Sequence, residues 1–322
     1  MTTTFDPFDT PGGYAWWYLD ALSDDGQCGL TLIAFIGSVF SPYYAWARKR
    51  GKGVADPLNH CALNVALYAR PGSSQPKGWA MTERGRKSVQ RSASSLVIGP
   101  SSITWRNDVL HVAINERTVP WGNAIRGEVR LYPSSQRLSK SYPLDAAGRH
   151  QWCPIAPYAS VEVDLEQPRL SWAGRGYLDS NWGERALAED FIRWDWSRAA
   201  LNGRTAVLYD ATRRDGTELS LAMEFDKGGQ AKKFSPPPLV DLPATSWLLA
   251  RSTRGDKTGH TDQPSDTRVD QTLEDSPFYA RSILQTQLLG EQVLAIHETL
   301  SLARWVEPVV QAMLPFRMPR RA

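Results

Sequence analysis

Hydrophobic and polar residues alternate along most of this chain in short segments typical of β-strands. The clearest segments are rich in β-branched residues or alternate with a period of two; they are residues 30–35, 63–68, 161–165, 205–208, 219–225 and 293–297. Few segments show a period of 3.6, and residues 303–314 are the best helix candidate, which Pro315 is expected to end. The pattern predicts an all-β protein with a short C-terminal helix.

A weak internal repeat predicts two similar β units. Trp16-Trp17-Tyr18 leads through polar residues to one apolar strand, and Trp194-Asp195-Trp196 leads through a turn to another. We therefore expect two antiparallel β-barrel or sandwich domains, residues 1–168 and 169–322, because a barrel of such strands can enclose a ligand-sized interior. Two polar stretches, residues 70–94 and 252–272, are predicted to be loops.

Composition narrows the classes of function. The chain has 322 residues, and its 13 Trp, 11 Tyr and 9 Phe suit strands and apolar pockets. A net charge of +3 with scattered basic residues gives no sign of nucleic-acid binding. The longest apolar run, residues 30–40, is about half a membrane span, and the first ten residues are polar, without a signal peptide. We expect a cytoplasmic protein whose membrane contact is peripheral.

Cofactor and metal motifs are missing from the sequence. The three cysteines, Cys28, Cys61 and Cys153, have no metal-ligand spacing and predict neither a disulfide framework nor a zinc site. The sequence contains no P-loop, no dinucleotide-binding glycine pattern, no GxSxG elbow and no HExxH pair. We therefore expect a protein without a metal or a cofactor.

Two segments carry candidate acid–base chemistry. In GRHQWCPIAP at 148–157, His150 and Trp152 are two residues apart; in GRGYLDSNWG at 174–183, Tyr177 and Asp179 have the same spacing. In extended strands each pair points to one face. An Asp among apolar neighbours is expected to have a raised pKa, which suits an acid catalyst, and aromatic faces stabilise cations. A core His and Trp with a turn-capping Asp remains an alternative.

A carbohydrate-binding site is another alternative. Aromatic side chains can bind sugar rings, and a pair of carboxylates beside them can cleave a glycosidic bond. Four carboxylates occur near Trp194 and Trp196, namely Glu184, Glu189, Asp190 and Asp195. Surface salt bridges are the more frequent use of such a charged group.

Eight segments in order resemble the carotenoid 1,2-hydratase family, also called hydroxyneurosporene synthases. They are PGGYAWWYLD at 11–20, IAFIGSVFSPYYAWAR at 33–48, MTERGR at 81–86, GRHQWCPIAP at 148–157, GYLDSNWG at 176–183, RWDWSRA at 193–199, TLEDSPFYARS at 272–282 and LPFRMPR at 314–320. The resemblance implies a lipocalin-like fold and addition of water, without a cofactor, to the terminal C1–C2 double bond of acyclic carotenes such as neurosporene or lycopene. It also implies peripheral association with the inner photosynthetic membrane.

The same resemblance implies roles for the two candidate pairs. Asp179 would protonate C2, a tertiary cation would form at C1 between Trp152 and Tyr177, and His150 or the Asp179 carboxylate would take a proton from the attacking water. The chain departs from the family pattern at Ala303, Trp305 and residues 184–186, which bears on local packing and substrate preference. A related isoprenoid or polyene cyclase and a non-catalytic isoprenoid carrier are the rival interpretations.

Overall fold

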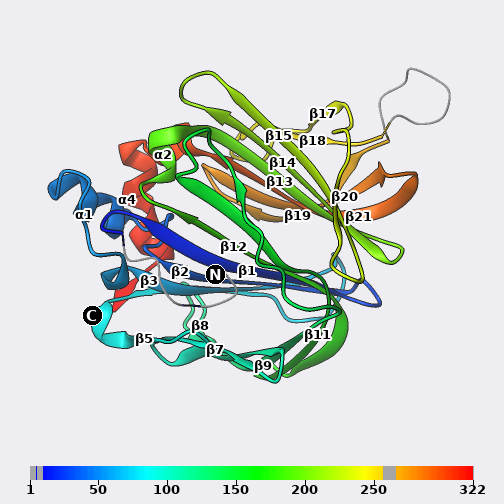
Figure 1. The fold of residues 1–322 in the computed structure, drawn as a ribbon. Helices are drawn as coiled ribbons and strands as arrows, with labels where there is room; N and C mark the ends of the chain where they lie inside the picture. The colour runs from blue at the N-terminus through cyan, green and yellow to red at the C-terminus, as the bar shows by residue number, and fades with distance from the viewer. Residues whose placement is uncertain (1–4, 6–9, 257–265, 322) are drawn as a thin grey trace. The chain divides into compact units, whose positions relative to one another are not determined.

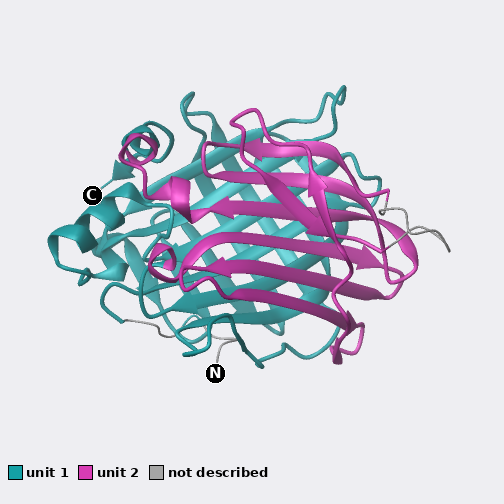
Figure 2. Ribbon diagram, turned by 90° about the horizontal axis from the view of Figure 1, so that it is seen from above, with its two compact units in different colours: residues 1–186, 312–322 teal, residues 187–311 magenta. Residues whose placement is uncertain are grey.

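The structure is a computed structural model that describes residue 5, residues 10–256 and residues 266–321. It is dominated by antiparallel strands with a few short helices (Figure 1), which confirms the all-β prediction. The chain forms two compact units, residues 1–186 with 312–322, and residues 187–311 (Figure 2). The predicted boundary at residue 168 lies instead in the turn between two paired strands of the first unit.

The first unit is built on one 13-stranded sheet, which contains β1–β12 and β22. The strands are β1 (Tyr14–Ser23), β2 (Cys28–Ile36), β3 (Cys61–Ala69), β4 (Gly78–Arg84), β5 (Val89–Arg91), β6 (Ser95–Ile98), β7 (Ser101–Arg106), β8 (Val109–Arg117), β9 (Ala124–Pro133), β10 (Tyr142–Pro143), β11 (His150–Gln167), β12 (Leu170–Gly183) and β22 (Arg320–Arg321). The helices are α1 (Pro42–Arg50), η1 (Pro57–Asn59) and η2 (Arg86–Ser88).

This sheet curls so that its two halves share one core. Apolar side chains from β1–β3 and from β6–β9 pack in the same cluster, and Arg84 of β4 forms an ion pair with Glu116 of β8. The central strands have a second face as well. In β1, Trp17 and Leu19 belong to the core cluster, so Trp16 and Tyr18 point to the opposite side of the sheet.

The interior of the curled sheet is filled, in contrast to the ligand-sized interior that was predicted. A cavity lined by Phe5, Trp17, Leu19, Leu178 and neighbouring residues measures about 10 Å³, close to the space needed by one water molecule. The prediction was wrong because large side chains alternate into this space from both halves of the sheet.

Replacing Leu19 by alanine is expected to destabilise the protein by about 2–5 kcal/mol. Leu19 is 2% exposed and lines the small cavity, so truncation removes apolar contacts and enlarges a void that the core cannot fill. Urea unfolding followed by fluorescence measures the loss. A variant as stable as the parent would contradict a filled interior.

The second unit has a seven-stranded sheet of β13–β16 and β19–β21 and a two-stranded sheet of β17 and β18. Its strands are β13 (Phe191–Leu201), β14 (Arg204–Arg213), β15 (Glu218–Asp226), β16 (Ala231–Lys233), β17 (Leu239–Leu242), β18 (Arg251–Arg254), β19 (Arg268–Asp275), β20 (Tyr279–Leu288) and β21 (Glu291–Ser301). The helices are α2 (Leu187–Asp190), α3 (Leu302–Trp305) and α4 (Pro308–Arg317), the last of which continues into the first unit.

Three local predictions need correction or restriction. Residues 70–94 are not a loop, because β4 and β5 lie within them. Polar residues in this stretch suggested a loop, but one of them, Glu83, is buried in β4 against His60 and Arg320. The C-terminal helix does not stop at Pro315, which lies inside α4. The predicted loop at 252–272 overlaps β18 and β19 at its two ends, and residues 257–265 lie outside the described residues.

Candidate active site

The pairing of β11 with β12 brings the two sequence pairs together. His150 is aligned with Gly183, and Trp152 is aligned with Asn181. Tyr177, Asp179, Asn181 and Gly183 alternate along one face of β12, while Leu178 between them belongs to the core cluster. All four predicted site residues therefore lie on the face of the sheet that points away from the filled interior.

Asp179 is the centre of this group. It is 2% exposed, and its Oδ2 accepts one hydrogen bond from the indole Nε1 of Trp152 and one from the hydroxyl of Tyr177, each at 2.8 Å. Trp152 and Tyr177 are themselves fully buried. The arrangement rejects the turn-capping interpretation of Asp179, because its partners are side chains from two strands rather than the amides of a turn.

Tyr177 is held in its neutral, hydrogen-donating form. Burial raises the pKa of its phenol well above the usual value, and the negative charges of Asp179 and Asp20 raise it further. Asp20 lies on β1 directly opposite Tyr177 and is 1% exposed. Because the phenol keeps its proton, it remains a donor to Asp179 throughout the neutral and moderately alkaline range.

His150 is fixed from two sides at the end of the same face. Its Nδ1 lies 2.8 Å from the hydroxyl of Tyr14, and its backbone N–H donates to Asp145. The imidazole stacks on the Tyr14 ring at a centroid distance of 5.8 Å. Gly183 makes this possible, since a Cβ there would lie 2.5 Å from His150 Nδ1 and 2.5 Å from the Tyr14 ring.

Sequence reasoning missed several neighbours of these four residues. Tyr14 and Asp145 hold His150, Tyr18 packs its ring edge-on against Tyr177 at 6.3 Å, and Tyr142 packs on Trp152 at 5.5 Å. A signal was available for β1, because Tyr14, Trp16, Tyr18 and Asp20 alternate in one strand. The contact between that strand and β12 depends on register, which the pattern does not encode.

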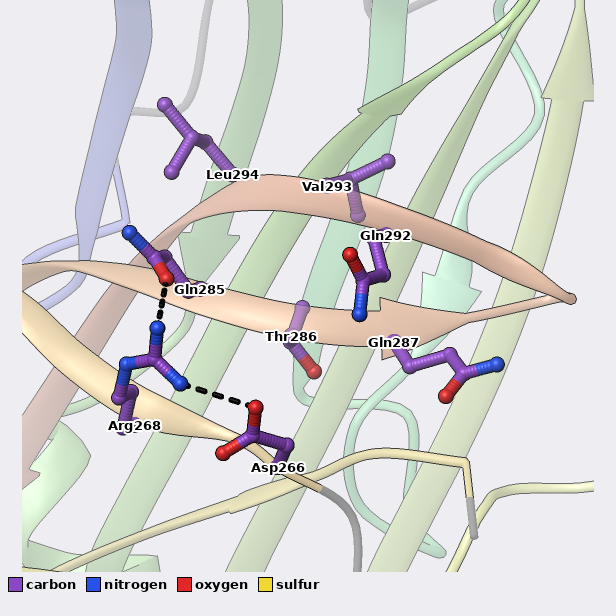
Figure 3. A pocket seen from close by; sticks show the side chains of 8 residues that line it. All are labelled: Asp266, Arg268, Gln285, Thr286, Gln287, Gln292, Val293 and Leu294. Atoms are coloured by element: carbon purple, nitrogen blue, oxygen red, sulfur yellow. Dashed lines mark hydrogen bonds and ion pairs between the residues drawn. The ribbon is translucent and has the colours of Figure 1, made fainter. Parts of the chain in front are cut away.

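Other parts of the molecule offer less chemistry. A surface pocket of about 310 Å³ is lined mostly by polar side chains in and next to β19–β21, where Arg268 is already bonded to Asp266 and Gln285 (Figure 3). Near Trp194 and Trp196, Asp195 is paired with Arg193 and accepts from Thr299, so at least this one of the four carboxylates considered for a sugar site is engaged in an ion pair.

In the described ranges, no three or more His, Cys, Asp and Glu side chains gather as metal ligands would. Within those same ranges, no helix is both long and apolar enough to cross a membrane.

Fold and site together define a lipocalin-like all-β protein with a buried carboxyl group held by a Trp and a Tyr. The same fold occurs in the crystal structure of an AttH protein from Nitrosomonas europaea, with a TM-score of 0.60 and 16% identity over 90% of this chain and 92% of that one. The sequence profile of the carotenoid hydratase CrtC family matches residues 32–322. The chain belongs to this family.

Curated relatives agree with that assignment. An acyclic carotenoid 1,2-hydratase of Thiocapsa roseopersicina is 54% identical over 98% of this chain and 75% of its own length. An acyclic carotenoid 1,2-hydratase of Rubrivivax gelatinosus is 48% identical over 99% of this chain and 76% of its own length.

Proposed function

We propose that this protein is a cofactor-independent hydratase that adds water across the terminal C1–C2 double bond of an acyclic carotene such as neurosporene or lycopene. The observation that carries the proposal is the buried Asp179 carboxyl group with its two donors, in a chain of the carotenoid hydratase family. Adding water to an alkene requires a proton donor and a proton acceptor but no net transfer of electrons, so an acidic side chain can begin the reaction.

The hydrogen bonds to Oδ2 support Oδ1 as the oxygen of Asp179 that delivers the proton. Both donors bond to Oδ2, so in the neutral acid Oδ2 is the carbonyl oxygen and the proton resides on Oδ1. In the first step the π electrons of C1=C2 form a bond between C2 and this proton, and the Oδ1–H bond breaks. A tertiary cation remains at C1, and Trp152 and Tyr177 stabilise the new carboxylate because their hydrogen bonds strengthen as its charge develops.

Water then completes the addition. A lone pair of the water oxygen forms the C1–O bond, and the resulting oxonium loses a proton to yield the tertiary alcohol. The Asp179 carboxylate, which has just protonated C2, is the base nearer to the cation. His150 is farther along the strand, because it is aligned with Gly183 and the Gly183 Cα is roughly 13 Å from the Asp179 Cα. In this proposal Asp179 recovers the proton, and His150, held by Tyr14, orients the water.

A cyclase or rearrangement catalyst is the second candidate. Protonation of a terminal alkene by Asp179 gives the same cation, and the outcome depends on whether water or another double bond attacks it. The fixed His150 beside Tyr14 favours hydration, because it supplies a polar group that can hold water. An isoprenoid carrier would need neither Asp179 nor His150 in a chemical role.

Isotope labelling distinguishes these functions. Purified protein is incubated anaerobically with lycopene or neurosporene in liposomes prepared in deuterated water, and the products are identified by chromatography and mass spectrometry. Hydration predicts a water adduct with one non-exchangeable deuterium at C2. A cyclase gives a product without added oxygen, and a carrier returns unchanged carotene; either result would refute the proposal.

A further inference from the structure

Helix α4 presents an apolar face to solvent. Val309, Met313 and Phe316 are 67%, 42% and 84% exposed, and their spacing of four and three residues places them on one side of the helix. A surface helix of a soluble protein normally carries polar residues on its outer face. Here most of the exposed positions are apolar, with Arg317 as the charged one, and Val310 on the other side is buried.

Basic residues accompany this face. From residue 308 to 321 the chain has three arginines and no acidic residue, and from residue 42 to 54 it has four basic residues and no acidic residue. Lys49, Arg50 and Lys52 at the end of α1 are exposed. The two segments meet in the first unit, where the Arg320 guanidinium lies over the Tyr43 ring at 5.9 Å.

The same end of the first unit carries the His150 side of the site. The Tyr44 hydroxyl of α1 donates to the Gly13 carbonyl at 2.6 Å, and Arg48 donates to the Gly12 carbonyl at 3.3 Å. Gly13 immediately precedes Tyr14, the partner of His150. Helix α1 is therefore fixed beside the strand end at which the row of site residues begins.

We propose that the face of α4 formed by Val309, Met313 and Phe316 docks on an anionic lipid bilayer, with the basic residues at the end of α1 contacting the headgroups. Apolar residues on one side of a helix enter the headgroup–acyl boundary, and neighbouring Lys and Arg add attraction to anionic lipid. Docking in this way turns the His150 end of the site toward the membrane. The last point rests on the proposed function, because it assumes a substrate dissolved in the bilayer.

Vesicle binding tests the docking face without relying on catalysis. The full chain is mixed with carotene-free vesicles of phosphatidylglycerol and phosphatidylcholine, and bound protein is measured by flotation. A Met313→Gln, Phe316→Gln double variant is expected to bind roughly tenfold to a hundredfold more weakly, and Phe316→Gln alone should show an intermediate loss. Lys49→Glu should weaken binding to anionic vesicles, and added salt should weaken binding of the parent chain.

The matched control is Leu239→Gln, which removes an apolar side chain that is 55% exposed on β17. It should bind vesicles like the parent. Unchanged vesicle binding by the double variant, or an equal loss of binding in the control, would overturn the proposal. The proposal would also fail if sedimentation showed that the double variant loses self-association while its vesicle binding is unchanged, because the face would then contact a second copy of the chain.

Turnover separates docking from chemistry. If both proposals hold, the double variant hydrates carotene in detergent micelles at the parent rate and carotene in vesicles more slowly. If the parent binds vesicles but hydrates nothing in either system, the proposed function fails while the docking face stands.

Discussion

Replacing Asp179 by asparagine is expected to lower the hydration rate by roughly 10²–10⁴-fold while the protein stays folded. The amide oxygen of asparagine can accept the two hydrogen bonds that Trp152 and Tyr177 now donate to Oδ2, so local packing is preserved. The amide nitrogen, however, cannot supply the proton that C2 needs. The measurement is the rate of water-adduct formation at saturating carotene, with binding of carotene followed separately by absorbance.

A matched control is Glu116→Gln, which makes the same carboxyl-to-amide change at another buried position of the first unit. Glu116 accepts from Arg84 and Ser101, on a strand that contributes to the core cluster rather than to the site face. Its variant should retain the parent rate per folded molecule. If Asp179→Asn binds carotene and hydrates it at the parent rate, Asp179 is not the acid.

Strand existence was predictable from the sequence because alternation of apolar and polar residues reflects the two faces of a strand. The central strands show the limit of this signal. Residues 28–36 form a strand in which every position is buried, so the sequence marks them as a β segment but does not say which side holds the core. On β12 the core residue Leu178 and the candidate site residues Tyr177 and Asp179 lie on opposite faces of one strand, a distinction that burial along a strand does not predict.

The four candidate site residues were named through the family resemblance, and the shared face of each pair followed from strand geometry; their catalytic roles stay a prediction. The mutual contact of the four residues was not predictable, because it depends on the β11–β12 register, which contains two shifts between Pro154 and Ala159. Asp145 illustrates a further limit. It reaches the backbone N–H of His150 through the turn at residues 145–148, and such a contact has no period that a sequence pattern could display.

Removing either hydrogen-bond donor to Asp179 is the second large effect that we expect. Trp152→Phe and Tyr177→Phe each delete one donor to Oδ2 and should each lower the hydration rate by roughly 10²–10³-fold, the usual effect of losing a donor to a developing oxyanion. Tyr132→Phe is the control, since it also removes a phenol hydroxyl that donates to a carboxylate, here the exposed Glu162. It should leave the rate in detergent micelles unchanged.

The two losses should not add independently. Both donors bond to the same oxygen, so removing one changes how strongly the other can stabilise the negative charge. A double-mutant cycle should therefore reveal coupling between the two substitutions. The pH profile provides a separate check. Because the pKa of Tyr177 is raised well above 10 by burial and by neighbouring carboxylates, the phenol stays protonated below that pH, and Tyr177→Phe should lower the rate without removing an alkaline limb. An alkaline limb that disappears in Tyr177→Phe would show that the phenol titrates, and additive losses would show that the two donors act on different steps.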